Sequence, residues 1–248
     1  MPELLYFDRD LVVLVKPVGL VSEDGDAGES VIPAAAAALS AAGERETALY
    51  PIHRLDRNVG GVMVYARTKR AAAALSAFVQ GGRLEKTYLA LIHGVPAEPC
   101  GTYRDLLYKD ARKNKTYVVS RMRKGVREAV LDYETLAATG DRTLVRVQLH
   151  TGRSHQIRVQ FASRGTPLVG DGKYGAQDHE KTIGLFSHSL TFPHPRDGSE
   201  MTFSALPGDE LFADALRAAG LTPCECRQNF RPRHKSVTCA AYNEIVQN

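Results

Sequence analysis

Residues 53–66 read HRLDRNVGGVMVYA, a charged loop that runs into an apolar strand. The second half, 61–66, has the length and composition of a buried strand. The first half places one acid, Asp56, between Arg54 and Arg57. Taken alone, these residues favour a surface loop with a local ion pair. The alternative is a carboxylate that its cationic neighbours keep ionised, which can act as a nucleophile or a base.

Strands and helices are predicted on both sides of this strand. Thr68 is the expected N-cap of a helix over 69–80, which stops at a glycine pair. The predicted strands are 4–7, 11–15, 61–66, 86–93, 116–120, 129–136, 143–149, 185–188 and 201–205, and the other predicted helices are 30–42, 154–163 and 209–219. This order predicts one mixed α+β domain over residues 1–248, built on a largely antiparallel sheet with flanking helices.

Composition excludes several classes of protein. A hydrophobic content of 44% and a charged content of 24% are those of a soluble globular chain. No run of 18 apolar residues occurs, so we expect no membrane span. The first ten residues lack the pattern of a signal peptide, which favours a cytoplasmic protein. Cys224 and Cys226 have no second pair at zinc spacing, and no glycine-rich nucleotide loop is present, so neither a metal nor a nucleotide cofactor is expected.

Basic residues cluster in two segments. Residues 104–128 contain nine Lys or Arg and three acids, and residues 142–173 contain six and one. A single charged run is usually a solvated face, but two such segments around apolar strands favour a surface for a polyanion. A further basic segment lies in the C-terminal tail, 224–248.

Two more segments carry candidate chemistry. In 151–158, TGRSHQIR, we expect Ser154 to cap a helix whose first turn carries His155, Gln156 and Arg158, which together would form an anion site. A generic phosphate-binding turn is the competing interpretation. In 86–91, KTYLAL, alternation puts Lys86 and Tyr88 on one face. Such a tyrosine is usually part of the core, but on the wall of a cleft it can stack on a base.

Together these segments resemble the RluA-type family of pseudouridine synthases. The family's aspartate, tyrosine and arginine motifs are matched by 53–56, 86–88 and 151–158. Two further family features follow in order, GDGKYG at 170–175 and SHSLTFPHP at 187–195. The chain departs from the family at 58–61, where it has Asn-Val-Gly-Gly for the usual Asp-Thr-Ser-Gly. The S4 RNA-binding domain of many relatives is expected to be absent, because the similarity begins near Met1.

The resemblance implies a fold, a reaction and a set of roles. It implies the pseudouridine synthase fold with a central catalytic cleft, and an enzyme that isomerises uridine in structured RNA, rRNA or tRNA, as a monomer without a cofactor. Asp56 would drive glycosidic cleavage, Arg158 would pair with it, and Tyr88 would stack on the target base. Arg54 would fill the gap left by the flipped base. The other residues implied to contact RNA are Lys86, Arg153, His155, Gln156 and Lys173.

Three alternatives compete with this interpretation. A glycoside hydrolase needs a second carboxyl group, for which Asp171 is the candidate. A metal-dependent hydrolase would use His53, His150 and His155, but their spacing is irregular and arginines surround them. The third alternative is a catalytically inactive RNA-binding or assembly protein with the same fold. The intact catalytic set of Asp56, Tyr88 and Arg158 argues against it.

Overall fold

The computed structural model describes residues 2–25 and 28–221. The predicted basic tail at 224–248, with Cys224 and Cys226, lies outside the described residues. The elements in chain order are β1 (Glu3–Phe7), β2 (Leu11–Lys16), α1 (Val31–Ala41), β3 (Tyr50–Pro51), β4 (Gly60–Ala66), α2 (Lys69–Gln80), β5 (Glu85–His93), β6 (Cys100–Asp110), β7 (Lys115–Val119), β8 (Val126–Thr139), β9 (Arg142–Leu149), α3 (Gln156–Ala162), a short 3-10 helix η1 (Gly172–Tyr174), β10 (Leu185–Pro193), β11 (Glu200–Ser204) and α4 (Glu210–Ala218).

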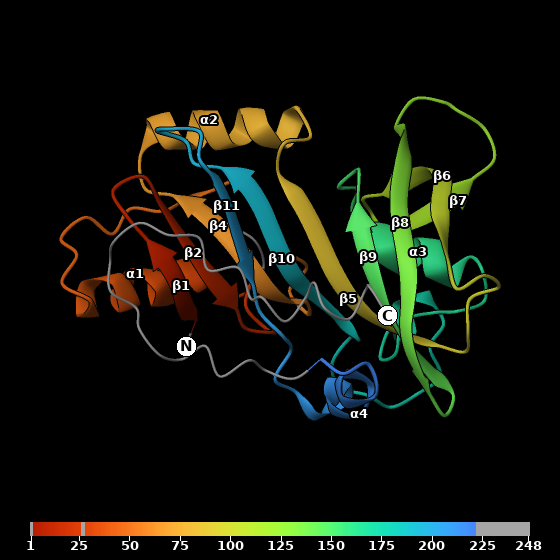
Figure 1. Cartoon of the computed structure of the whole chain (residues 1–248). Helices are drawn as coiled ribbons and strands as arrows, with labels where there is room; N and C mark the ends of the chain where they lie inside the picture. Colours follow the sequence, from red (N-terminus) through yellow and green to blue (C-terminus); the bar gives the residue numbers. More distant parts are fainter. Residues whose placement is uncertain (1, 26–27, 222–248) are drawn as a thin grey trace.

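The strands form one eleven-stranded sheet in the order β1-β2-β4-β10-β5-β9-β8-β6-β7, with β3 paired to β4 and β11 to β10 (Figure 1). The β4–β10 pair is parallel, and the other pairs of these strands are antiparallel. This topology confirms the predicted mixed, largely antiparallel sheet. No helix in the described part of the chain has the length and apolar character needed to cross a membrane.

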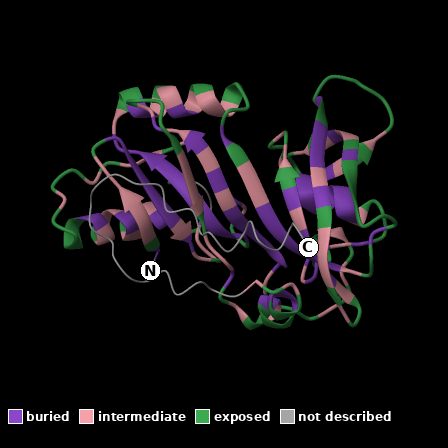
Figure 2. Ribbon diagram, in the orientation of Figure 1, coloured by how far each residue is buried: buried purple, intermediate pink, exposed green. Residues whose placement is uncertain are grey.

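Helices cover both faces of the sheet. Because strand side chains alternate, Met63 and Tyr65 of β4 pack in one cluster with α1 and α3, whereas Val62 and Val64 pack in another with α2. Alternate residues of β5 divide in the same way, with Tyr88 toward α1 and α3, and Leu89 in the cluster that α4 covers. Figure 2 shows the buried residues concentrated in the strands between these layers.

The geometry at the start of β4 explains why Gly60 and Gly61 follow the loop that carries Asp56. Here β4 runs parallel to β10, with Gly60 beside Phe186 and Gly61 beside Ser187. Gly61 has a φ of +125°, and a Cβ at this position would lie 2.3 Å from the Ser187 carbonyl oxygen. A Cβ on Gly60 would stay 3.2 Å from the nearest backbone oxygen, that of Lys16. Glycine is therefore required at 61, while the family's serine would fit at 60 with a small adjustment.

We expect Gly61→Ala to lower the free energy of unfolding by at least about 2–3 kcal/mol, because the new methyl group meets backbone and the φ is unfavourable for alanine. Chemical denaturation followed by circular dichroism measures this loss. The matched control is Gly60→Ala, for which we expect a loss below about 1.5 kcal/mol. Equal losses in the two variants would contradict the close approach of β4 and β10.

The structure corrects several local predictions, three of which concern α3, β6 and β8. Helix α3 begins at Gln156 and not at Ser154, because its N-cap is His155, which adopts a left-handed conformation with a φ of 53° and makes no side-chain cap. Strand β6 was not predicted, since charged residues interrupt its alternation. Strand β8 is longer than predicted, 14 residues from Val126 to Thr139. The predicted cap of α2 is confirmed, with Thr68 Oγ1 accepting from the Ala71 N–H at 3.1 Å.

Candidate active site

The loop that carries Asp56 is braced by the segment that follows β2. The Ser22 hydroxyl accepts from the Leu55 N–H at 3.0 Å and donates to the Leu55 carbonyl at 2.9 Å. On the other side of Asp56, the Gly19 N–H donates to the Arg57 carbonyl at 2.8 Å, and Arg57 Nε donates to the Gly19 carbonyl at 2.9 Å. The backbone is thus held immediately before and after Asp56.

This loop is held in place even though residues 58–61 depart from the family's usual Asp-Thr-Ser-Gly. Val59 is buried in the core cluster, and its N–H donates to the Asp56 carbonyl at 3.0 Å. An apolar side chain therefore anchors the loop where the family usually has a threonine. The bracing comes from Ser22 and from the backbone of Gly19.

Lys16, which was not among the residues predicted to be functional, also supports the loop. Its side chain is fully buried, and Nζ donates to the carbonyls of Pro17 at 2.9 Å and Leu20 at 2.7 Å. A longer bond of 3.5 Å reaches the Arg57 carbonyl. Burial lowers the pKa of Lys16 to about 8, and the charge of Asp56 opposes that shift. The available signal was a lysine at the end of an otherwise apolar strand, which is rare without a partner.

Arg158 of α3 holds two carboxylates at once. Its Nε and Nη2 donate to the two oxygens of Asp171 at 2.6 and 2.8 Å, and its Nη1 donates to Asp56 Oδ2 at 2.8 Å. The Asp171 side chain is 1% exposed and that of Arg158 is 7% exposed, whereas Asp56 remains 34% exposed. The guanidinium is therefore anchored on the buried acid and presents one donor to the accessible acid.

Electrostatics keep this arginine charged. Burial alone would lower the pKa of Arg158, but the hydrogen bonds and charge of Asp171, followed by those of Asp56, raise it above its ordinary value. The same geometry weakens the glycosidase alternative. Both oxygens of Asp171 accept from Arg158 inside the protein, so Asp171 is placed to orient the arginine and not to act as a second catalytic carboxyl group.

Tyr88 is a core residue of β5 and interacts electrostatically with Asp56. Its side chain belongs to the core cluster between the sheet and α3. Burial raises the pKa of Tyr88, and the charge of Asp56 raises it further, while a hydrogen bond with Ser187 opposes the shift. The phenol is therefore neutral at physiological pH.

His155 lies beside the carboxylate. Its Nε2 is 3.7 Å from Asp56 Oδ2, its Nδ1 is 2.8 Å from the Tyr174 hydroxyl, and its side chain is 8% exposed. Burial lowers the pKa of His155, the charge of Asp56 opposes this shift, and Arg158 reinforces it. A residue that the family resemblance assigned to RNA thus packs against the candidate catalytic group.

The other two histidines of the metal alternative are occupied elsewhere. His53 is buried, its Nε2 accepts from the Val64 N–H at 3.3 Å, and burial lowers its pKa well below the usual value. His150 pairs with Asp132 at 2.6 Å on an exposed part of the sheet. Among the described residues, the group whose ligand atoms do come together is Asp8, Asp10 and His194, which includes none of the three histidines proposed.

Four of the residues that the family resemblance assigned to RNA binding differ in their exposure and in their contacts within the protein. Arg54 is exposed and pairs with Glu23 at 2.6 Å. Arg153 donates from Nε to the Glu128 carbonyl at 2.8 Å, and Lys173 donates to the Asn114 carbonyl at 3.2 Å. Burial lowers the pKa of Lys86.

Gln156 differs from these because it is buried. Its Oε1 accepts from the Thr151 hydroxyl at 2.8 Å and from the Arg153 N–H at 3.0 Å. Its Nε2 donates to the Val130 carbonyl at 3.1 Å. This geometry favours a role in holding the 151–156 turn in place over direct contact with RNA.

Fold and site together define a class of protein. The fold is a mixed sheet with helices on both faces. In the site, Asp56 of a loop accepts from buried Arg158 of α3, and Tyr88 of β5 lies in the core cluster that α3 covers. This is the arrangement that the motif resemblance implied for a pseudouridine synthase.

Comparison with known proteins gives the family. The family model described as RNA pseudouridylate synthase matches residues 10–163. An uncharacterized RNA pseudouridine synthase of Mycobacterium bovis is 34% identical over 218 residues, which cover 83% of this chain and 70% of the relative. The uncharacterized RNA pseudouridine synthase YlyB of Bacillus subtilis is 31% identical over 214 residues, 84% of this chain and 70% of the relative. The chain belongs to the RNA pseudouridylate synthase family, of the RluA type, and is an isomerase.

Solved structures of low sequence identity share the fold. Human RNA Pseudouridylate Synthase Domain Containing 4 superposes with a TM-score of 0.71 at 23% identity, covering 88% of this chain and 93% of the human one. Human RNA Pseudouridylate Synthase Domain Containing 1 gives a TM-score of 0.63 at 22% identity, covering 90% and 96%. The predicted fold class is thereby confirmed.

Proposed function

We propose that this enzyme isomerises specific uridines in structured RNA, either rRNA or tRNA, and that Asp56 is its catalytic carboxylate. The observation that carries the proposal is the anchored arginine. Arg158 is fixed on buried Asp171 and offers its remaining Nη1 donor to Asp56. The two predicted catalytic residues, 102 positions apart in the chain, therefore meet at hydrogen-bond distance.

The reaction breaks one bond and forms another without a change of oxidation state. The N1–C1′ bond of uridine is broken, C5 bonds to C1′, the proton on C5 is lost and N1 gains a proton. Asp56 either attacks C1′ or removes a ribose proton, and both routes need its ionised form. Arg158 stays charged and donates to Asp56 Oδ2 at 2.8 Å, which orients the carboxylate. The balance requires no redox cofactor.

The target base has to leave its helix before it can react. Base flipping costs a few kcal/mol, which protein contacts must offset. Arg54, 59% exposed and two residues before Asp56, would enter the space that the base vacates. Tyr88, 6% exposed in the core cluster, would have to become more accessible before it could stack on the base. Because its phenol is neutral, Tyr88 could remove the C5 proton only after giving up its own proton to another base.

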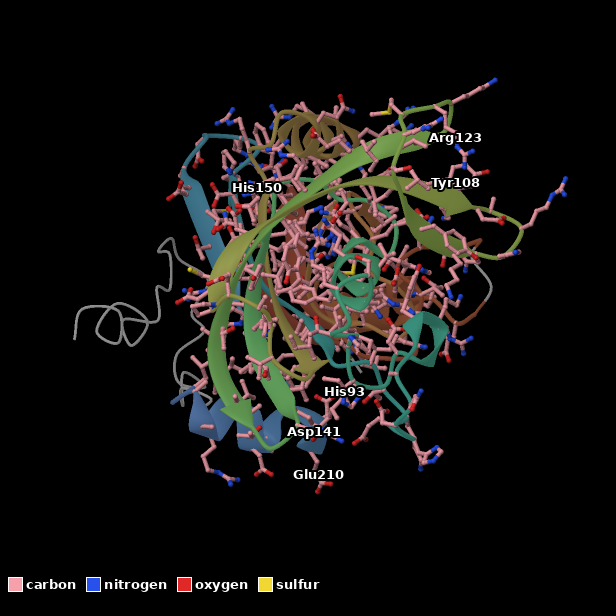
Figure 3. The ribbon with its side chains drawn as sticks, turned by 90° about the vertical axis from the view of Figure 1, so that its right-hand side faces the viewer. His93, Tyr108, Arg123, Asp141, His150 and Glu210 are labelled. Atoms are coloured by element: carbon pink, nitrogen blue, oxygen red, sulfur yellow. The ribbon has the colours of Figure 1, made fainter. Side chains whose placement is uncertain are left out.

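A basic hairpin supplies a surface for the RNA backbone. The turn between β6 and β7 exposes Arg112 and Lys113, and the loop after β7 exposes Arg121, Arg123 and Lys124. In Figure 3, Tyr108 and Arg123 lie at the end of the molecule opposite His93, Asp141 and Glu210. Contacts to phosphates from such a surface add affinity without reading sequence.

We expect the affinity for RNA to fall steeply as salt is raised, because each phosphate contact releases counterions. Arg112→Ala and Lys113→Ala should each reduce the slope of log K against log salt by about 0.7–0.9. Fluorescence anisotropy with a labelled RNA hairpin measures the slope. Lys69→Ala, on the exposed surface of α2, is the control with the same loss of charge. A slope that the hairpin variants leave at the wild-type value would contradict the assignment of this surface.

The substrate is identified by mapping pseudouridines in total RNA from cells with and without the gene. We expect one or a few sites in rRNA or tRNA to disappear and to return when the gene is restored. If the chain were an inactive binding protein of the same fold, the map of pseudouridines would be unchanged. The monomeric state and the cytoplasmic location remain predictions from the sequence.

A further inference from the structure

The Tyr174 hydroxyl joins two segments that meet at the site. It accepts from the Thr116 N–H of β7 at 2.8 Å and lies 2.8 Å from His155 Nδ1. Donation from the Tyr174 hydroxyl to Nδ1 is the favoured direction, because an Nδ1–H tautomer would turn the lone pair of Nε2 toward the Asp56 carboxylate. The remaining proton of a neutral His155 is then on Nε2, the nitrogen 3.7 Å from Asp56 Oδ2.

The charges around His155 keep the ring neutral. Burial lowers its pKa, Asp56 opposes that shift, Arg158 and Lys173 lower the pKa again, and Asp171 opposes. Since the result lies below the ordinary value of 6.5, the ring carries one proton at neutral pH. An Nε2–H directed at a carboxylate favours the position of that carboxylate without adding a charge.

The ring of Tyr174 lies close to two cations. The guanidinium of Arg158 and the ammonium of Lys115 each lie 5.2 Å from its centroid. His155 meets it edge-on, with centroids 5.7 Å apart and planes at 88°. His155 also keeps a left-handed backbone with a φ of 53°, which costs a non-glycine residue about 1 kcal/mol or more. Surrounding contacts must maintain this conformation.

The same cluster is fastened to the basic hairpin. Lys173 Nζ donates to the Asn114 carbonyl at 3.2 Å, and the Thr116 hydroxyl donates to the Ser154 carbonyl at 2.9 Å. With the Thr116–Tyr174 bond, three hydrogen bonds connect residues 114–116 to Ser154, Lys173 and Tyr174, which are His155's neighbour in the chain and the segment that carries Tyr174. The position of the hairpin and that of the His155 ring are therefore mechanically linked.

We propose that Tyr174 and His155 are positioning residues for the reaction, through which the RNA-binding hairpin is coupled to the catalytic carboxylate. Tyr174 fixes His155 as the tautomer whose Nε2–H faces Asp56, and it ties that ring to the backbone of β7. This inference rests on the proposed function of Asp56, but its structural half is independent of activity.

The tautomer is tested by long-range proton–nitrogen NMR on protein labelled at histidine with nitrogen-15, with His155→Leu giving the assignment. We expect His155 to be a single neutral Nε2–H tautomer at pH 7. His53, whose Nε2 accepts from Val64, provides an internal reference for the opposite tautomer. In Tyr174→Phe the neutral ring loses the bond donated to Nδ1, so the pKa of His155 should rise toward 6.5 and the tautomers should mix. An unchanged spectrum in that variant, or an Nδ1–H tautomer in the wild type, would overturn the proposal.

Kinetics test the coupling. In Tyr174→Phe and His155→Leu we expect the single-turnover rate to fall by about 10- to 100-fold while the Kd for RNA changes by less than about twofold. The double variant should lose no more than the worse single variant, because the two residues act in series. Tyr50→Phe is the control for losing a tyrosine hydroxyl, because Tyr50 packs in the cluster on the α2 side of the sheet. Fully additive losses, or losses confined to Kd, would indicate separate structural or binding roles and overturn the coupling.

The two hypotheses fail separately. If wild-type protein forms no pseudouridine in any RNA that it binds, the proposed function fails, whatever the histidine spectrum shows. If the enzyme is active and Tyr174→Phe keeps the wild-type rate and spectrum, the function of Asp56 stands and the positioning role is wrong.

Discussion

Asp56→Asn is expected to abolish pseudouridine formation, with a rate loss of at least about 10³-fold, because the amide can neither attack C1′ nor remove a ribose proton. The substitution keeps the shape of the side chain and its hydrogen bond from Arg158 Nη1. Folding and RNA affinity should therefore stay close to those of the wild type. The rate is measured under single-turnover conditions with RNA from cells that lack the gene.

The control for Asp56→Asn is a variant that loses the same charge at another position. Asp132→Asn removes one carboxylate from an exposed strand position, where it pairs with His150, and should leave the rate unchanged. If Asp56→Asn kept a rate within about tenfold of the wild type, Asp56 would not be the catalytic carboxylate.

Arg158→Met is expected to reduce both stability and activity. It leaves Asp171 buried without its bidentate partner, and removal of one member of a buried pair costs about 3–5 kcal/mol of unfolding free energy. It also removes the donor to Asp56, so the rate should fall by at least about 10²-fold at temperatures where the variant is folded. Thermal unfolding and single-turnover kinetics measure the two effects.

A second substitution separates the two effects. In the double variant Arg158→Met/Asp171→Asn the unpaired buried charge is gone, so we expect part of the lost stability to return. The rate should not recover, because nothing replaces the Nη1 donor to Asp56. A double variant no more stable than Arg158→Met would contradict the role of Asp171 as the buried anchor. Recovery of the rate would contradict the need for the arginine beside Asp56.

The sequence predicted the sheet and its helices well where local patterns decide them. The apolar run before Arg67 became β4, and Thr68 caps α2 as expected. Strand β6 was missed because it lies near the edge of the sheet, where exposed charged residues break the alternation that identifies a strand. The start of α3 was misplaced because His155 takes a left-handed conformation that depends on tertiary contacts.

The site was predictable as a set of motifs but not as a geometry. Family resemblance named Asp56 and Arg158, and the structure brings them within 2.8 Å. The family resemblance could not show that Asp171 holds the arginine, or that Lys16 braces the loop from inside the core. Such contacts join residues far apart in the chain, and no spacing rule encodes them. Gln156 shows the reverse case, since a polar residue in a binding motif turned out to be buried.

The central claim is that the chain forms pseudouridine, and the most direct measurement is the release of tritium from RNA labelled at C5 of uridine. Formation of the C5–C1′ bond displaces the C5 hydrogen, so each uridine that is isomerised releases its tritium. Purified protein is incubated with tritiated total RNA transcribed in cells that lack the gene. We expect release that stops at one tritium per target uridine and is absent with Asp56→Asn. No release by the folded wild-type protein from RNA that it binds would contradict the claim.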